Sequence, residues 1–175
     1  PADVQPVPTA GSTPAVEVEV KIADLIIDPK LQMRAKPHEG QYIMDLMGVI
    51  KEGTLTEPIV VFRDPTDGSL RVADGHARVD ATRSSGGATI RARVHEGGLR
   101  EAFEFALGAN ATHGAQRTNA DRRKAVLTAL ADSEMMNWSS VRIAQVCHCS
   151  DHVVADIRNE LEGQDGMPTE TNREG

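Results

Sequence analysis

The sequence predicts an α+β fold, with a mixed-sheet domain over residues 16–109 followed by an all-helical unit over residues 110–162. In the first region, segments that alternate apolar and polar residues like strands are interleaved with segments of helical period. In the second, apolar residues recur with the helical period alone. Residues 1–15 and 163–175 have no periodicity and are expected to form a disordered leader and tail.

The expected order in the first region is strand, helix, strand, strand, helix, strand, helix. The strands are VEVEVKI, PIVVF, LRVA and ATIRARV, and the helices are YIMDLMGVIKEG, DGHARVDATRSS and GLREAFEFALGANA. The turn formers in DPTDGS predict a hairpin between PIVVF and LRVA. The first helix should be ended by Gly53, and its apolar stripe consists of Ile43, Leu46, Met47 and Ile50.

The helical region begins with TNADRRKAVLTALAD, for which Thr118 or Asn119 is the expected cap. The segment SSVRIAQVCHCSDHVVADIRNEL then splits into two short helices around a tight turn at residues 148–150. Two short helices joined by small residues are typical of a helix-turn-helix. Trp138 is expected to pack within this unit.

Composition limits the class of protein. Hydrophobic residues make up 39% of the chain and aromatic residues 3%, so the core must be aliphatic. The net charge is -7, so a nucleic-acid partner would need a local basic patch. The two cysteines, Cys147 and Cys149, are too close for a disulfide framework, which suits a reducing compartment. With no apolar run of about 18 residues, we expect a cytoplasmic protein without a membrane partner.

The stretch DGHAR, residues 74–78, places an acid, a glycine and two cations at the start of a helix. Asp74 could cap that helix, and Gly75 lets the backbone turn or approach a ligand closely. The free N–H groups of the helix start, together with His76 and Arg78, would make a cradle for phosphate. The alternative is a capped turn with two exposed cations, and the residues alone favour neither.

Two other polar stretches could belong to a site. Residues 108–124 are rich in hydrogen-bonding groups, and the residues that could form an anion site there are Asn110, His113, Gly114 and Arg117. The densest basic cluster of this acidic chain follows and consists of Arg117, Arg122, Arg123 and Lys124. We favour a binding function over a solvated helix start. The third stretch contains Gln32 and Arg34, and by itself reads as an ordinary loop.

Taken together, the three stretches resemble the ParB/sulfiredoxin superfamily. DPKLQMRA, DGHARVDA and NATHGAQRTNADRRKAV are similar, in that order, to the three ParB sequence boxes, and a helix-turn-helix follows as in ParB. We refer to these stretches as box I (residues 28–35), box II (residues 74–81) and box III (residues 110–126). The resemblance covers roughly residues 17–162, and the order and spacing of the boxes make it more specific than any one of them.

The resemblance implies a nucleotide site built from all three boxes. That site would grip the triphosphate of CTP or ATP with Mg²⁺, and the nucleotide state would control DNA binding. The implied phosphate contacts are Gly75, His76, Arg78 and Arg117. Arg34 would lie beside the nucleotide, Gln32 near the hydrolytic water, and Asn110 would help to hold Mg²⁺. A homodimer is compatible with the resemblance.

Departures from the ParB pattern keep other functions open. Ala109 stands where ParB usually has a Glu that partners the metal, which favours an adaptor with an inactive site. Box II has His76-Ala77 where ParB commonly has Glu-Arg. The turn lacks the cysteine that sulfiredoxin needs, so sulfinic acid reductase activity is not expected. An enzyme of the same fold, a DNase or nucleotide-dependent phosphotransferase, would use His76 as general acid or base and Asp74 as a metal ligand.

The expected DNA contacts are Arg117, Arg122, Arg123, Lys124, Arg142, His152 and Arg158. The last helix carries more acidic than basic residues, and DNA affinity depends mostly on neutralising phosphates. It therefore either reads bases through a few groups such as His152 and Asn159 or is purely structural. The cluster Cys147, His148, Cys149 and His152 does not match a familiar zinc spacing, so a packed turn is favoured over a metal site.

Overall fold

The computed structural model describes residues 15–36, 40–54, 57–109 and 117–165. The expected leader lies outside the described residues except for its last position. The last helix continues through Asp165, so it includes the first three residues that were assigned to the tail.

The order of elements predicted from the sequence is confirmed. The strands are β1 Val16–Lys21, β2 Leu25–Ile26, β3 Ile59–Arg63, β4 Leu70–Asp74 and β5 Thr89–Glu96. The helices are α1 Gly40–Lys51, α2 His76–Ser84, α3 Leu99–Gly108, α4 Asn119–Leu130, α5 Ser140–Cys147 and α6 Asp151–Asp165. Short 3₁₀ turns are η1 Ile22–Asp24, η2 Pro29–Leu31 and η3 Met135–Asn137. Strand β2 was not predicted, because two residues are too few to show alternation.

The five strands form one mixed sheet in the order β1-β5-β3-β4-β2. The predicted hairpin is confirmed, since β3 pairs antiparallel with β4. Strand β5 lies between β1, to which it is antiparallel, and β3, to which it is parallel. Strand β2 adds a parallel edge beside β4, and it leads directly into the box I loop.

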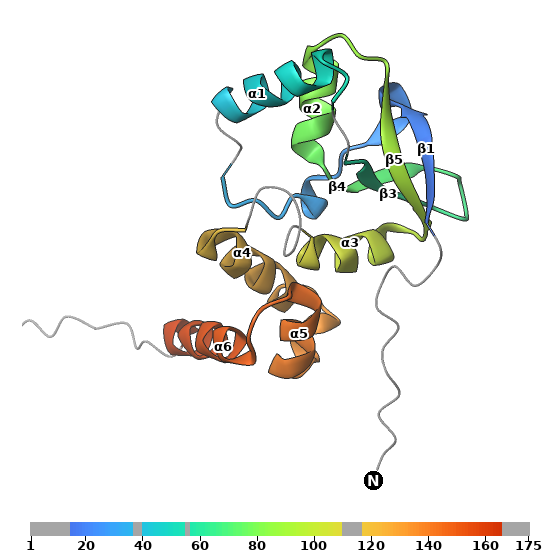
Figure 1. Ribbon diagram of the computed structural model, residues 1–175. Helices are drawn as coiled ribbons and strands as arrows, with labels where there is room; N and C mark the ends of the chain where they lie inside the picture. Colours follow the sequence, from blue (N-terminus) through green and yellow to red (C-terminus); the bar gives the residue numbers. More distant parts are fainter. Residues whose placement is uncertain (1–14, 37–39, 55–56, 110–116, 166–175) are drawn as a thin grey trace, which may run out of the picture.

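The alternation of β3 divides the core between the two faces of the sheet. Ile59 and Val61 belong to a cluster with Val79 of α2, whereas Val60 and Phe62 pack with the small residues of α3. Helix α2 accordingly covers one face and α3 the other (Figure 1). Helix α1 lies against α2 with its apolar stripe only half-buried, and none of its residues is fully buried.

The helical unit shares its core with α3. One hydrophobic cluster joins Ala106 of α3 to Val126 of α4, Ile143 of α5 and Val154 of α6. The expected break between the last two helices is confirmed at His148, which takes a left-handed conformation with φ of 49°. In the described part of the chain, no helix is long and apolar enough to cross a bilayer.

Burial of His95 gives the fold a pH-dependent component. Its ring is stacked on Phe62 at 5.2 Å, and its Nδ1 has no hydrogen-bond partner within the described parts of the chain. Burial, reinforced by Arg93, lowers the pKa of His95 below 6.5. As the pH falls, the unfolded chain therefore binds a proton at this histidine more readily than the folded protein does. The contribution of the neutral ring to the free energy of unfolding is present above about pH 6.5 and falls as the pH drops below it.

We expect His95→Phe to weaken this dependence, because a phenyl ring preserves the stack and cannot be protonated. Thermal unfolding at about pH 7 and about pH 5 tests it, with the melting temperature of the variant falling less than that of the wild type. Part of the dependence should remain, since burial also lowers the pKa of His76. Equal losses in the two proteins would contradict the assignment.

Candidate functional site

The fold brings the three boxes to one small cavity. It lies between the box I loop, the start of α2, the end of α3 and the start of α4, and it is lined by Leu31, Gln32, Met33, Arg34, His76, Ala109, Arg117 and Asp121. Its volume is about 20 Å³, about the size of one water molecule. A phosphate group can therefore enter only if side chains of the wall move apart.

Hydrogen bonds hold the box I loop against α4. Arg34 Nη1 donates to the Asp121 carboxylate at 3.0 Å, and the Ala35 N–H donates to the same carboxylate at 2.8 Å. Lys124 Nζ donates to the carbonyl oxygens of Gln32 at 2.7 Å and Arg34 at 2.8 Å. Sequence reasoning treated Arg34 as a ligand of the nucleotide and Lys124 as a DNA contact, whereas here both join the sheet domain to the helical unit.

Asp121 was missed by the sequence analysis and is central to the site. Its carboxylate also accepts a hydrogen bond from the Thr118 N–H, and the Thr118 hydroxyl accepts one from the Asp121 N–H, forming a capping box. Burial alone would raise its pKa, but hydrogen bonds from Ala35, Thr118 and Arg34 outweigh it and lower the pKa of Asp121 to about 2. The pattern Thr-x-x-Asp was the local signal available for this role.

Arg117 enters the cavity from the opposite side. It is only 8% exposed, and its Nη1 donates to the Cys147 carbonyl at the end of α5 at 2.9 Å. Its Nη2 is buried without a hydrogen-bond partner among the described residues. Burial lowers the pKa of Arg117, although an arginine stays charged at neutral pH. A buried guanidinium with unused donors is the chemical group that an anion requires.

His76 is the first residue of α2, and its Nε2 is also buried without a partner in the described structure. Burial lowers its pKa, opposed by the nearby charges of Asp74 and Asp80. The helix is capped by Gly75, whose φ is 95°, with no side-chain cap. The expectation that Asp74 caps α2 was therefore wrong. A Cβ at Gly75 would lie 2.6 Å from Ile59 Cγ2, which explains the glycine.

Arg78 has its hydrogen bonds satisfied inside the domain. It donates to the carbonyl oxygens of Glu57 at 2.9 Å and Pro58 at 2.8 Å, and to the Asp74 carboxylate at 3.1 Å. Arg78 thereby ties the start of α2 to the residues that lead into β3. Neither His76 nor Arg78 is exposed. The alternative of a capped turn with two exposed cations is therefore wrong.

The expected basic surface is smaller than the sequence indicates. Arg117 is buried and Lys124 is half-buried, so neither belongs to an open patch. Arg142 stacks on the Trp138 ring at 3.6 Å, and Arg158 donates to the Trp138 carbonyl. These four side chains use their cationic groups inside the protein, which sequence spacing alone could not reveal.

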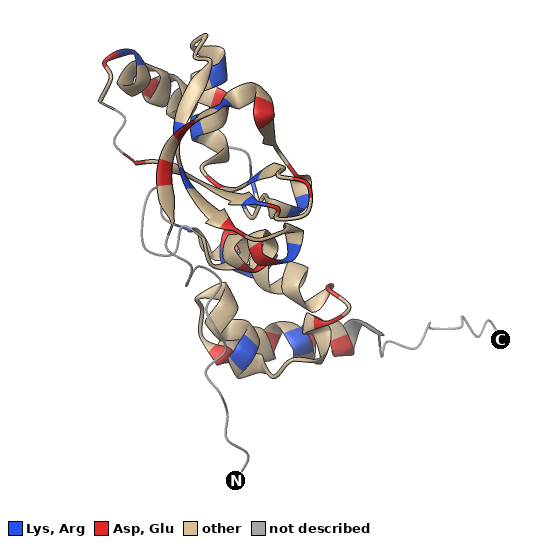
Figure 2. Cartoon of the chain, turned by 90° about the vertical axis from the view of Figure 1, so that its right-hand side faces the viewer, with Lys and Arg blue, Asp and Glu red and all other residues tan. Residues whose placement is uncertain are grey.

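Arg122 and Arg123 of α4 and His152 of α6 remain exposed. Arg123 pairs with Glu160 of α6, and acidic and basic residues are interspersed over the sheet and the helical unit (Figure 2). Asn110, His113 and Gly114 lie outside the described residues. Among the described residues, no group of three His, Cys, Asp or Glu side chains could hold a metal ion.

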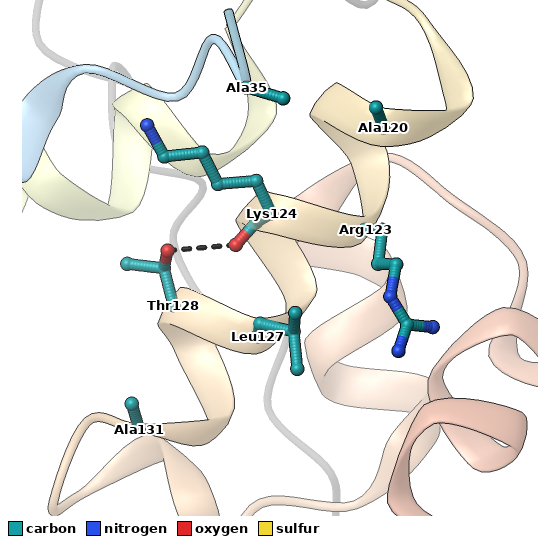
Figure 3. Close-up of a pocket in the computed structure, with 7 residues that line it drawn as sticks. All are labelled: Ala35, Ala120, Arg123, Lys124, Leu127, Thr128 and Ala131. Atoms are coloured by element: carbon teal, nitrogen blue, oxygen red, sulfur yellow. Dashed lines mark hydrogen bonds between the residues drawn. The ribbon is translucent and has the colours of Figure 1, made fainter. Parts of the chain in front are cut away.

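An open groove runs along the outer side of α4 below the box I loop. It has a volume of about 510 Å³ and is lined by Ala35, Ala120, Arg123, Lys124, Leu127, Thr128 and Ala131. Figure 3 shows Lys124 reaching towards the box I loop and Arg123 extending away from it. The two adjacent cations on α4 therefore line the same groove but point in different directions.

Comparison with known proteins identifies the family. Residues 8–111 match the ParB N-terminal domain family, which is more than half of the chain, so the protein belongs to it. The resemblance inferred from the three boxes is thus confirmed at the level of the family.

The relatives include two regulators from streptomycetes. The chain is 32% identical over 155 residues to a protein of Streptomyces griseus described as a possible regulatory protein of the streptomycin biosynthesis operon, covering 86% of this chain and 43% of that protein. It is 33% identical over 102 residues to the transcriptional regulator NovG of Streptomyces niveus, covering 58% of this chain and 30% of that one. The chain therefore spans less than half the length of these relatives.

A solved structure shares the α+β fold. It is the C-terminally truncated chromosome-partitioning protein ParB of Caulobacter crescentus complexed to the centromeric parS site, with a TM-score of 0.56 and 20% identity over 87% of this chain and 73% of that chain. At this identity the likeness concerns the fold alone, and it confirms the predicted fold class.

We expect Asp121→Asn to destabilise the protein by about 2–4 kcal/mol, because it removes the charge of a buried carboxylate that pairs with the half-buried Arg34 and accepts hydrogen bonds from two backbone N–H groups. Chemical denaturation of both proteins measures the difference. The matched control is Asp80→Asn, which removes an exposed ion pair with Arg83 and should cost less than about 1 kcal/mol.

The same variant tests the lowered pKa of Asp121. The stabilisation from its charge is present above about pH 4 and is lost as the pH falls towards about 2. The wild type should therefore lose its advantage over Asp121→Asn within that window. A constant difference in unfolding free energy across the window would contradict the role given to the carboxylate.

Proposed function

We propose that this protein is a DNA-binding regulator of the ParB type whose cavity binds the phosphates of a nucleotide. The observation that carries the proposal is that box I, box II and box III meet at one cavity, which is lined by a buried Arg117 whose Nη2 has no partner among the described residues. An unpaired buried donor costs about 1–3 kcal/mol, so its presence needs a reason. An anion that supplies the acceptor is such a reason.

The surroundings of Arg117 suit a phosphate group. The N-terminus of α2 has no side-chain cap, and its first residue, His76, lines the cavity. A helix N-terminus carries a partial positive charge and free N–H donors, which stabilise anions. Arg34 adds a second guanidinium to the wall, although in this structure it is paired with Asp121.

A nucleoside triphosphate, CTP or ATP, is the ligand that family membership favours. Gln32 and Ala109 also line the cavity. Ala109 replaces the acidic residue that ParB usually has there, and Asp121 is committed to Arg34 and to two backbone N–H groups. The described lining therefore suits nucleotide binding better than metal-assisted hydrolysis, and Mg²⁺ binding would depend on Asn110, outside the described residues.

DNA binding would fall to the helical unit. Two relatives of this chain are named as regulators, and the ParB structure that shares its fold is bound to DNA. Helices α5 and α6 meet at a tight turn, as in a helix-turn-helix, and the exposed Arg122 and Arg123 lie on the neighbouring helix α4. The acidic α6 would then contribute less to phosphate contact than α4.

The alternative of a nuclease or phosphotransferase receives no support from the geometry. Asp74, the metal ligand that this alternative would need, forms an ion pair with Arg78 at 3.1 Å. An adaptor with an inactive site remains the outcome if no nucleotide binds.

We expect Arg117→Gln to abolish the rise in melting temperature that CTP or ATP with Mg²⁺ produces in the wild type. Amide donors cannot supply the charge that a polyphosphate requires. Thermal unfolding with CTP, ATP and GTP tests this, and a ligand at about 100 times its Kd should stabilise the wild type by about 2.7 kcal/mol. Arg83→Gln, on the exposed side of α2, is the control and should keep the response. No response of the wild type to any nucleotide would overturn this part of the proposal.

We expect the double variant Arg122→Gln, Arg123→Gln to weaken DNA binding and to flatten its salt dependence. Each lost phosphate contact lowers the slope of log K against log salt by about 1. Binding to duplex DNA measured at several salt concentrations gives the slope. Arg63→Gln, an exposed cation of β3 paired with Glu96, is the control. An unchanged slope would show that α4 does not face DNA.

A further inference from the structure

His76 departs from the ParB pattern, and the structure places it in the cavity wall. Its ring is mostly buried, its Nε2 has no partner among the described residues, and it belongs to the same lining as Arg34, Arg117 and Asp121. Imidazole is the side chain whose charge changes near neutral pH. The question is what an anion in this cavity would do to that charge.

The side chains that line the cavity with His76 carry more positive than negative charge. Across the cavity, Arg34 and Arg117 carry two positive charges, and the carboxylate of Asp121 carries one negative charge. With His76 neutral, the wall has one net positive charge. A proton on His76 would add a second, in a site that burial has already made unfavourable for charge.

The remaining charged groups near His76 form pairs of their own. On α2, Asp80 pairs with Arg83 at 3.5 Å, and Arg78 pairs with Asp74 and lies 3.9 Å from the carboxylate of Glu57. Asp80 with Arg83 is neutral as a pair, whereas Arg78 with Asp74 and Glu57 carries one net negative charge, and the charges of Asp74 and Asp80 oppose the effect of burial on the pKa of His76. These charges stay the same when a ligand binds, so the charge that changes around His76 on binding is that of the cavity contents.

A doubly charged phosphate group would reverse this balance. Entering beside one net positive charge, it would leave the cavity with one net negative charge, which a protonated His76 neutralises. The imidazolium would also give the unpaired Nε2 an N–H that donates to a phosphate oxygen. Both effects favour the charged ring only while the anion is present.

We propose that His76 takes up a proton when an anion binds in this cavity, which makes the site a pH-sensitive anion receptor. This inference rests on the proposed function, because it concerns the same cavity. The proton moves from solvent to the imidazole, and no covalent bond to the ligand forms. Affinity should consequently rise as the pH falls from about 7.5 to about 6, by at most about tenfold per pH unit.

Calorimetric titration of the full chain with inorganic pyrophosphate tests the inference. Measurements in two buffers of different ionisation enthalpy give the number of protons taken up. We expect the wild type to take up more protons than His76→Asn and its affinity relative to the variant to rise about threefold to tenfold between about pH 7.5 and about pH 6.5. Because pyrophosphate titrates in this range itself, only the difference between the proteins is diagnostic. His148→Asn, whose side chain can keep the left-handed turn, should behave as the wild type.

A direct measurement covers the case in which His76→Asn does not fold. The pKa of His76 in the wild type, followed by NMR with and without saturating pyrophosphate, should rise on binding. Binding with no rise, or equal proton uptake by wild type and His76→Asn, overturns this inference and leaves the proposed function standing. Binding of neither pyrophosphate nor nucleotide at any pH overturns both.

Discussion

The ionised carboxylate of Asp121 is the interaction on which the site depends. It lies at the first turn of α4 and accepts hydrogen bonds from the Arg34 side chain and from the backbone of Ala35 and Thr118. One side chain therefore caps the first helix of the helical unit and fixes the loop that follows β2. Without this charge, the box I loop would lose the contact that places it over the cavity.

Apolar and polar contacts contribute differently to the junction between the sheet domain and the helical unit. The hydrophobic cluster that runs from α3 through α4 to α6 supplies most of the free energy, because it removes the largest apolar area from water. Such contacts are nonetheless less directional than hydrogen bonds. The directional bonds from Asp121 and Lys124 to box I set the register of α4 against the sheet domain, and so determine which residues face the cavity.

Much of the fold could be predicted from local pattern, and the site only in part. Alternation in VEVEVKI and ATIRARV identified the paired strands β1 and β5, although only β5 buries most of one face and β1 buries Val20 alone of its three valines. The resemblance to the ParB boxes implied that the three stretches form one site. Arg78 and Arg117 looked alike in the sequence, yet Arg78 has its donors satisfied by carbonyls and Asp74, whereas Arg117 keeps one nitrogen unpaired. That difference arises from long-range packing, which local sequence does not encode.

The unpaired donors argue that the cavity is more than a by-product of packing. Burying His76 Nε2 and Arg117 Nη2 without partners among the described residues costs free energy, and a shorter side chain at either position would avoid that cost. The Arg78 guanidinium, by contrast, donates to two carbonyl oxygens and a carboxylate of the same domain. His76 at the start of α2 and Arg117 just before α4 line the same cavity, and a multivalent oxyanion can accept hydrogen bonds from both at once.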